Sequence, residues 1–253
     1  MMSEKKMFLN AIRTVLWEKW VDFKFEWKKI TSAALVSPLL YMIALGWGLG
    51  SSRVTDRPYI DFLVPGIIAL TTMNGSFSAV AQPLNVQRLY ERSFDCIIIS
   101  PTPMPAYIIG QMLGGALRGM YAGILILLLS IPFGASMHIT PAFFLVMLLN
   151  GMTFSALGVL AAILAVTHAD ISRFSTFAIL PMTFLCNTFF PLDTVPAAVK
   201  GLIRILPLTH ASGTLRAIAY GESPNLLSLG ILALYAVIFM ILANVVVSRR
   251  KNL

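Results

Sequence analysis

Residues 141–167 read PAFFLVMLLNGMTFSALGVLAAILAVT, a run of 27 residues without a single Asp, Glu, Lys or Arg. A hydrocarbon core about 30 Å thick needs roughly 20 consecutive apolar residues in a helix, so this run is long enough to cross a bilayer. Similar runs recur along the 253-residue chain, which is 57% hydrophobic and 12% charged, whereas soluble domains are roughly 25% charged. The sequence therefore predicts an all-α integral membrane protein.

The apolar runs predict six transmembrane helices in one domain, residues 30–253. Their ranges are about 30–50, 59–82, 106–132, 141–167, 174–191 and 226–247. The most polar interior segment, residues 83–105, joins the second helix to the third.

Residues 1–29 carry a different pattern. Apolar side chains recur at spacings of three and four between Phe8 and Trp27, while Arg13, Glu18 and Lys24 point mostly elsewhere. This periodicity predicts an amphipathic helix with tryptophan on its apolar side, which is typical of a helix lying in the headgroup plane.

The formal charge of +8 is best explained by membrane topology. With both termini in the cytoplasm, thirteen Lys and Arg residues lie inside, five lie outside, and Arg118 lies within a span. The positive-inside rule thus favours a multi-pass protein of the inner or plasma membrane with both termini cytoplasmic. The basic residues show no pattern of a nucleic-acid groove, so we expect no nucleic-acid partner.

Residues 191–223 are long for a loop but too apolar for one. Residues 195–206 and 209–220 each favour a helix too short to cross a bilayer, and Pro207 separates them. We expect a re-entrant helix pair that dips into the outer leaflet; a pair lying on the surface is the alternative.

The second and fifth predicted spans carry the side chains best suited to a substrate path. A slit lined by hydroxyls, amides and aromatic rings suits an amphiphile better than a bare ion. Ordinary hydrogen bonding between helices is the alternative for any one of these residues. The candidate path residues are Thr72, Asn74, Ser76, Phe184, Asn187 and Phe190.

Glycines at positions 110, 114, 115, 119 and 123 predict close helix packing in the third span. Catalytic motifs are missing: the sequence contains no phosphate-binding loop G-x-x-x-x-G-K-[ST], no H-E-x-x-H and no G-x-S-x-G. We therefore expect no enzyme activity of its own, no metal site and no bound cofactor. Arg118 is the one candidate for an ionisable residue buried in a span, where it would reach the membrane surface, pack, or line a polar vestibule.

Several motifs resemble those of the ABC type-2 exporter permeases, a family that includes exporters of nodulation lipo-oligosaccharides, drugs and polysaccharides. QRLYER at 87–92 and SPTP at 100–103 resemble the family's first cytoplasmic loop. FPL at 190–192, VP at 195–196, LPLTH at 206–210 and LR at 215–216 resemble its F-P-L…L-P…N-P-L-T-Y…L-R signature. His210 stands where the family commonly has tyrosine, and Leu206 where it often has asparagine.

The resemblance implies a type V exporter fold: two six-helix permeases, the second an identical copy, resting on two copies of a cytoplasmic ATPase that binds ATP and Mg²⁺. It implies that the interfacial helix and a short cytoplasmic helix at about residues 85–93 touch the ATPase. It also implies that the second and fifth spans face the path of an amphiphilic substrate. The implied coupling residues are Arg88, Leu89, Tyr90, Glu91, Arg92, Trp17 and Trp20, and the implied gate residues are Pro191, Pro196, Pro207 and His210.

Two other classes of function stay open. A self-sufficient carrier or channel is suggested by the polar spans and Arg118, although a carrier driven by an ion gradient normally needs more buried ionisable groups. An intramembrane enzyme would have to use His168, Asp170 or Arg173, and the sequence offers no catalytic geometry for these residues.

Overall fold

The computed structural model describes residues 4–48, 53–54, 57–186, 188–190 and 196–251. Its helices are α1 (Glu4–Tyr41), α2 (Tyr59–Leu89), α3 (Ser93–Ile99), α4 (Met104–Ser130), α5 (Pro141–Leu164), α6 (His168–Phe174), α7 (Leu180–Leu185), α8 (Ala197–Ile205), α9 (Pro207–Ala219) and α10 (Leu226–Lys251). Two π-helical segments, η1 (Met42–Trp47) and η3 (Ser175–Ile179), and a 3-10 turn, η2 (Ile131–Phe133), extend some of these helices. Two antiparallel strands of two residues each, β1 (Arg53–Val54) and β2 (Arg57–Pro58), lie between η1 and α2.

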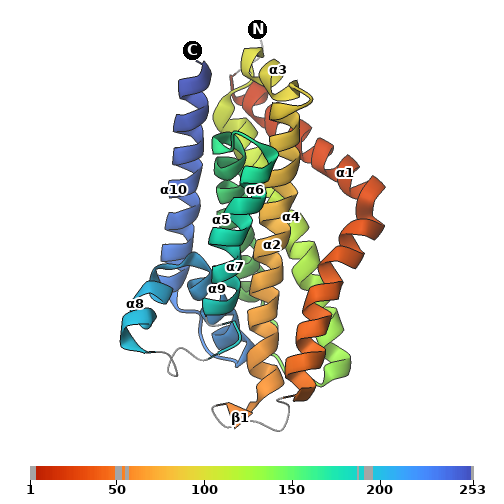
Figure 1. The fold of residues 1–253 in the computed structure, drawn as a ribbon, viewed down its shortest axis with the longest axis vertical. Helices are drawn as coiled ribbons and strands as arrows, with labels where there is room; N and C mark the ends of the chain where they lie inside the picture. The colour runs from red at the N-terminus through yellow and green to blue at the C-terminus, as the bar shows by residue number, and fades with distance from the viewer. Residues whose placement is uncertain (1–3, 49–52, 55–56, 187, 191–195, 252–253) are drawn as a thin grey trace.

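The long helices form an elongated bundle in which α2, α4 and α5 pack against one another at the centre (Figure 1). Helix α10 packs on α5 at one side, and α1 packs on α4 at the other. Figure 1 shows that α1 begins and α10 ends at the same end of the bundle, which we call the terminal end. Helix α3 also lies there, whereas β1, α8 and α9 lie at the opposite end.

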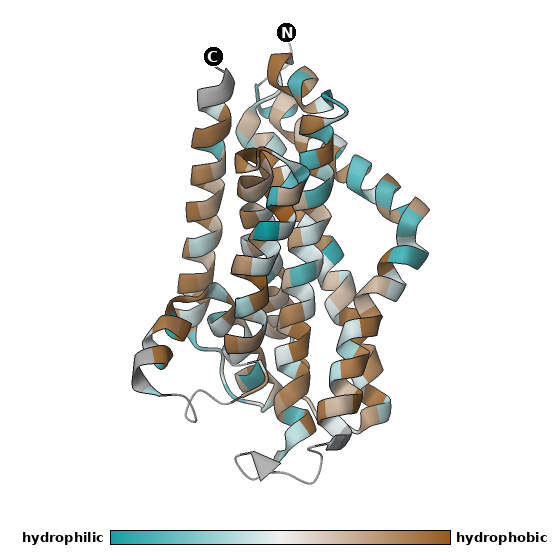
Figure 2. Ribbon diagram, in the orientation of Figure 1, coloured by the Kyte–Doolittle hydropathy of each residue, from teal (hydrophilic) through white to brown (hydrophobic). Residues whose placement is uncertain are grey.

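Five helices are long and apolar enough to cross a membrane: Glu4–Gly46, Tyr59–Leu89, Met104–Phe133, Pro141–Leu164 and Leu226–Ser248. They correspond to five of the six predicted spans. Hydropathy is uneven along α1, because hydrophilic residues gather on its upper limb and apolar residues on its lower limb (Figure 2).

The fifth predicted span, 174–191, is not one uninterrupted α-helix. The chain there passes from α6 through η3 to α7, which ends at Leu185. Pro181 has no backbone N–H to donate to the preceding turn, and the turn before it is π-helical, with Leu180 N donating to Ser175 O. Its last predicted residue, Pro191, lies outside the described residues.

Helix α1 joins the predicted interfacial helix to the first span without a break. No Gly or Pro occurs between Glu4 and Ser37, so nothing interrupts the helical hydrogen bonds across the expected boundary at residues 29 and 30. The helix instead bends, and its upper limb runs obliquely to the bundle (Figure 1). Residues 24–29 of α1 are all exposed. The division into a domain at 1–29 and one at 30–253 stays a prediction.

The glycines of α4 let neighbouring helices approach closely, as the sequence predicted. A Cβ added at Gly110 would lie 2.8 Å from Cβ of Val15 in α1, and one added at Gly119 would overlap Oγ of Ser76 in α2. Both positions therefore need a residue without a side chain.

Helices α8 and α9 occupy the stretch predicted as a re-entrant pair. Pro207 begins α9, where its missing N–H costs no hydrogen bond. Ten of the 13 residues of α9 are buried, against α2, α5 and α10, so α9 does not lie on the surface of the bundle. Helix α8 is more exposed, with Leu202 and Ile205 outward and Ile203 buried.

Candidate functional site

A groove of about 490 Å³ lies between α1, α2, α4 and the η3–α7 segment. Its polar lining residues come from all four walls: Ser37 of α1, Thr71, Asn74 and Ser78 of α2, Arg118 of α4, and Ser175, Thr176 and Thr183 of η3 and α7. The rest of the lining consists of alanine, leucine and isoleucine side chains together with Pro38, Tyr41 and Gly75. Such a mixed lining can hold a molecule with both a polar and an apolar part.

The polar side chains of α2 lie on two different faces. Thr71, Asn74 and Ser78, spaced by three and four residues, face the groove. The side chains of Thr72 and Ser76 are fully buried on another face, where Ser76 Oγ approaches Gly119 of α4 and Thr72 Oγ1 approaches Gly123. Of the three predicted path residues in this helix, only Asn74 lines the groove.

The predicted aromatic path residues lie near the end of α7. Phe184 is 47% exposed, and its ring centroid is 5.7 Å from that of Phe189. Phe190 is also exposed. None of the three lines the groove, whereas Thr183 beside Phe184 does. Asn187 lies outside the described residues.

Arg88 is buried at the terminal end of the bundle, with 8% of its surface exposed. Its Nη1 donates to the Ile163 carbonyl over 2.5 Å, and its Nη2 donates to the Ala165 carbonyl. These carbonyls belong to the C-terminal end of α5, where a cation is favoured by the helix dipole and by unsatisfied acceptors. Arg88 therefore caps α5 and does not point outward.

Three of the predicted coupling residues that follow Arg88 are exposed. Tyr90 is 68% exposed, and Glu91 and Arg92 are exposed as well, while Leu89 is half-buried. Arg92 adopts a left-handed backbone with φ 53°, which separates α2 from α3. The short helix expected at residues 85–93 is thus α3, at Ser93–Ile99, and residues 85–89 form the last turn of α2.

Helix α1 brings its tryptophans to the same region. Gln87 Nε2 donates to Glu18 Oε1 over 2.7 Å, which ties α1 to the end of α2. Trp17 and Trp20 are both exposed, whereas Val15 is buried against α4. The predicted coupling residues of α1 and α2 therefore lie at one end of the molecule.

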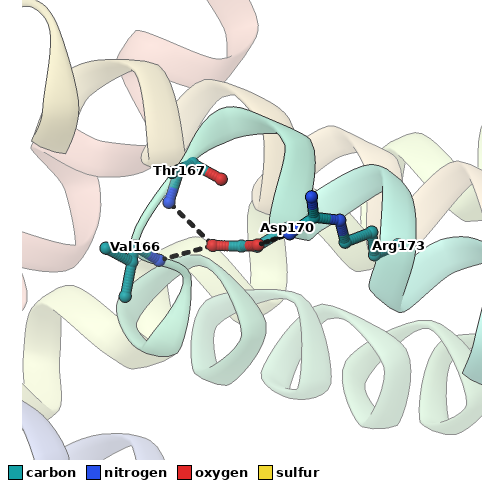
Figure 3. Close-up of polar contacts among 4 residues, drawn as sticks. All are labelled: Val166, Thr167, Asp170 and Arg173. Atoms are coloured by element: carbon teal, nitrogen blue, oxygen red, sulfur yellow. Dashed lines mark hydrogen bonds and ion pairs between the residues drawn. The ribbon is translucent and has the colours of Figure 1, made fainter.

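The connection between α5 and α6 is also held by the end of α2. His168 Nδ1 lies 3.0 Å from Asn85 Oδ1. Asp170 accepts hydrogen bonds from the backbone N–H groups of Val166 and Thr167, at 3.0 and 2.8 Å, and its ion pair with Arg173 is 2.9 Å long (Figure 3).

Asp170 caps the N-terminus of α6, and this role explains its hydrogen bonds. Thr167 and Asp170 form a capping box at the start of α6. The backbone hydrogen bond from Thr167, followed by a side-chain hydrogen bond from the same residue, lowers the pKa of Asp170 below its ordinary value. Of the three residues that an enzyme would have to use, Asp170 thus caps α6, His168 contacts Asn85 of α2, and Arg173 pairs with Asp170 within α6.

The predicted gate residues are part of the α8–α9 corner. Pro196 precedes α8 and Pro207 begins α9. His210 Nε2 lies 2.9 Å from the Arg204 carbonyl, and its Nδ1 lies 3.4 Å from Ser228 Oγ, so His210 links α8, α9 and α10. Pro191 lies outside the described residues.

Arg216 was not among the predicted site residues. It is buried in α9, its Nε donates to the Phe62 carbonyl over 3.1 Å, and its guanidinium lies 3.7 Å from the centre of the Phe62 ring. Its position in an otherwise apolar segment was the feature of the sequence that could have identified Arg216 as a buried residue with a specific role. Arg216 anchors α9 to α2.

Known proteins resemble this chain over most of its length. The family model described as ABC-2 type transporter matches residues 10–220. The inner membrane transport permease YadH of Escherichia coli (strain K12) is 28% identical over 92% of this chain and 97% of its own length. Nodulation protein J of Rhizobium meliloti (strain 1021) is 28% identical over 97% of this chain and 98% of its own length. Nodulation protein J of Rhizobium leguminosarum bv. viciae is 26% identical over 91% of this chain and 93% of its own length.

Proposed function

Since the chain belongs to the ABC-2 type transporter family, we propose that it is the permease subunit of an ATP-driven exporter whose ATPase is a separate polypeptide. The name of the Escherichia coli relative, an inner membrane transport permease, and the apolar helices support a multi-pass protein of the inner membrane. The observation that carries the proposal is the family match over residues 10–220.

Six passes through the membrane fit the bundle best. Helices α1 and α10 have their outer ends at the same end of the bundle, which requires an even number of passes (Figure 1). Five helices satisfy the length and hydropathy of a span. We assign the sixth pass to the stretch that contains the η3–α7 segment, with the charged residues of α6 outside the membrane. The positive-inside rule then puts the terminal end in the cytoplasm and the α8–α9 pair in the outer leaflet.

The energy comes from a companion protein in this proposal. The sequence contains no phosphate-binding loop, so ATP and Mg²⁺ belong to the partner ATPase. Two copies of this chain form the permease, on two copies of the ATPase. The exposed residues Trp17, Trp20, Tyr90, Glu91 and Arg92 form its docking surface.

The hydrogen bonds at the terminal end suggest how a push on that surface reaches the groove. Gln87 is bonded to Glu18 of α1, and Asn85 contacts His168 of α6. Helix α1 is one wall of the groove, and α6 continues into η3 and α7, which form another. A shift of the end of α2 would therefore move both walls, and closure of the ATPase pair would favour one of two arrangements. The transported molecule is an amphiphile whose polar part contacts Thr71, Asn74 and Thr183.

Docking is tested by charge reversal at exposed residues. The double variant Glu91→Lys, Arg92→Glu is expected to lose copurification with the co-expressed ATPase while keeping its yield in the membrane. The control is Arg204→Gln, an exposed arginine at the opposite end of the bundle. Undiminished copurification of the double variant would refute this docking surface. Equal movement of a fluorescent amphiphile by the permease alone, with or without nucleotide, would favour a self-sufficient carrier.

A further inference from the structure

The groove contains one charged side chain that its own architecture does not use. We propose that Arg118 binds the anionic headgroup of the molecule held in the groove, so that this permease selects negatively charged amphiphiles. This inference rests on the proposed transport function, because it assigns the substrate class of the same groove.

Arg118 is the only charged residue that lines the groove within the described part of the chain. Its guanidinium makes no hydrogen bond or ion pair with any residue that the structure describes; the ion pairs found there are Lys29–Glu26 and Arg173–Asp170. A guanidinium that is partly removed from water gains most from an anion that accepts two hydrogen bonds at once.

A second polar group in the groove is also unsatisfied. Thr71 is 5% exposed, lines the groove, and its Oγ1 has no hydrogen-bond partner among the described residues. A buried hydroxyl without a partner is costly, and a ligand that accepts its hydrogen bond removes that cost. Arg118 and Thr71 thus provide a charged and a neutral donor for one oxygen-rich headgroup.

The carboxylates near Arg118 do not replace such a ligand. Asp22 and Glu26 of α1 attract the charge of Arg118, but both are exposed, and Glu26 lies 3.5 Å from Lys29. Their interaction with Arg118 is therefore partly screened by water. An anion inside the groove would interact with Arg118 at close range.

The rest of the lining suits an acyl or alkyl chain. Ile30, Ala33, Leu70, Ile179 and Leu180 present apolar surface to the same groove. Burial of a hydrocarbon chain contributes about 0.8 kcal/mol for each CH₂ group. The ligand therefore needs both parts, and a bare anion should bind poorly.

Binding to the isolated permease tests this assignment without the ATPase. Native mass spectrometry in a neutral detergent would compare lysophosphatidic acid with lysophosphatidylcholine of the same chain. The wild type is expected to bind the anionic lipid about tenfold more tightly, as for a charge-assisted pair. Arg118→Gln should bring the ratio of the two affinities close to one. Arg118→Lys should keep part of the preference for the anionic lipid, and the control Arg204→Gln should keep all of it.

A second variant covers the case in which Arg118→Gln does not fold. Thr71→Val preserves the shape of the side chain but removes the hydroxyl, and is expected to weaken binding of lysophosphatidic acid about threefold. The assignment is overturned if the wild type shows no preference for the anionic lipid, if folded Arg118→Gln keeps that preference, or if Thr71→Val binds lysophosphatidic acid as tightly as the wild type. Competition by millimolar inorganic phosphate would also overturn it, because the site would then take a bare anion. These results leave copurification with the ATPase, and so the proposed function, untouched.

Discussion

Arg88→Gln should destabilise this protein far more than the same change at Arg92, four residues along the chain. Arg88 is buried and donates to the carbonyls of Ile163 and Ala165 at the end of α5. Glutamine is shorter and neutral, so both carbonyls lose a charged donor in a site that water does not reach. Arg92 is exposed, and its charge lies in water in the folded and the unfolded protein.

The magnitude follows from those two hydrogen bonds. A hydrogen bond to a charged group contributes about 1.5–3 kcal/mol, so losing two costs roughly 3–6 kcal/mol. One kcal/mol shifts the Tm of a domain of this size by about 2–4 °C, which predicts a fall of at least about 6 °C. The Tm of Arg88→Lys should lie between those of the wild type and Arg88→Gln, because an ammonium group keeps the charge but lacks the planar fork that reaches both carbonyls.

Thermal unfolding in detergent measures this directly, with Arg92→Gln as the matched control. A difference of less than about 1 °C between the two variants would refute the claim that Arg88 caps α5. The two positions also distinguish a role in stability from a role in coupling to the ATPase. A charge reversal at Arg92 should lower stimulation of the ATPase without a change in Tm.

Three further changes test other parts of the fold. Gly119→Ala should lower the free energy of unfolding by about 1–3 kcal/mol, because the added Cβ overlaps Ser76. Gly230→Ala, which has open space around it, should leave the free energy of unfolding unchanged. The lowered pKa of Asp170 means that its cap is fully present above the ordinary carboxyl pKa and is lost as the pH falls through the lowered value. Asp170→Asn should therefore flatten the dependence of Tm on pH below the ordinary carboxyl pKa of 3.8, and an unchanged slope would contradict this. Arg216→Gln should loosen α9 and speed alkylation of buried Cys186 by maleimide in a Cys96→Ser background, while a rate equal to that of the parent would show that Arg216 is not the anchor.

Hydropathy predicted the long helices well because membrane spans depend on local composition. Residues 141–164 carry no charged side chain over the whole of α5, and the same holds for most of α10. The interruption at η3 was harder to predict. Pro181 marks a disturbed turn, but the widened π-helical turn before it depends on how the neighbouring helices pack.

Contacts between distant residues explain most of what the sequence could not predict at the site. Arg88 is 75 and 77 residues from the two carbonyls that it caps, so its charge looked like part of an exposed surface. The helical spacing of Asn74 with Thr71 and Ser78 was visible in the sequence. Only the packing of α4 shows that this face, and not the face of Thr72, meets the groove.

Transport by proteoliposomes tests the central claim that this chain carries the path and a separate ATPase supplies the energy. Purified permease, reconstituted with or without its co-expressed ATPase, would be assayed for movement of a fluorescent lysophosphatidic acid after addition of ATP and Mg²⁺. We expect movement only when both proteins and hydrolysable ATP are present. Equal movement by the permease alone, without nucleotide, would contradict the account.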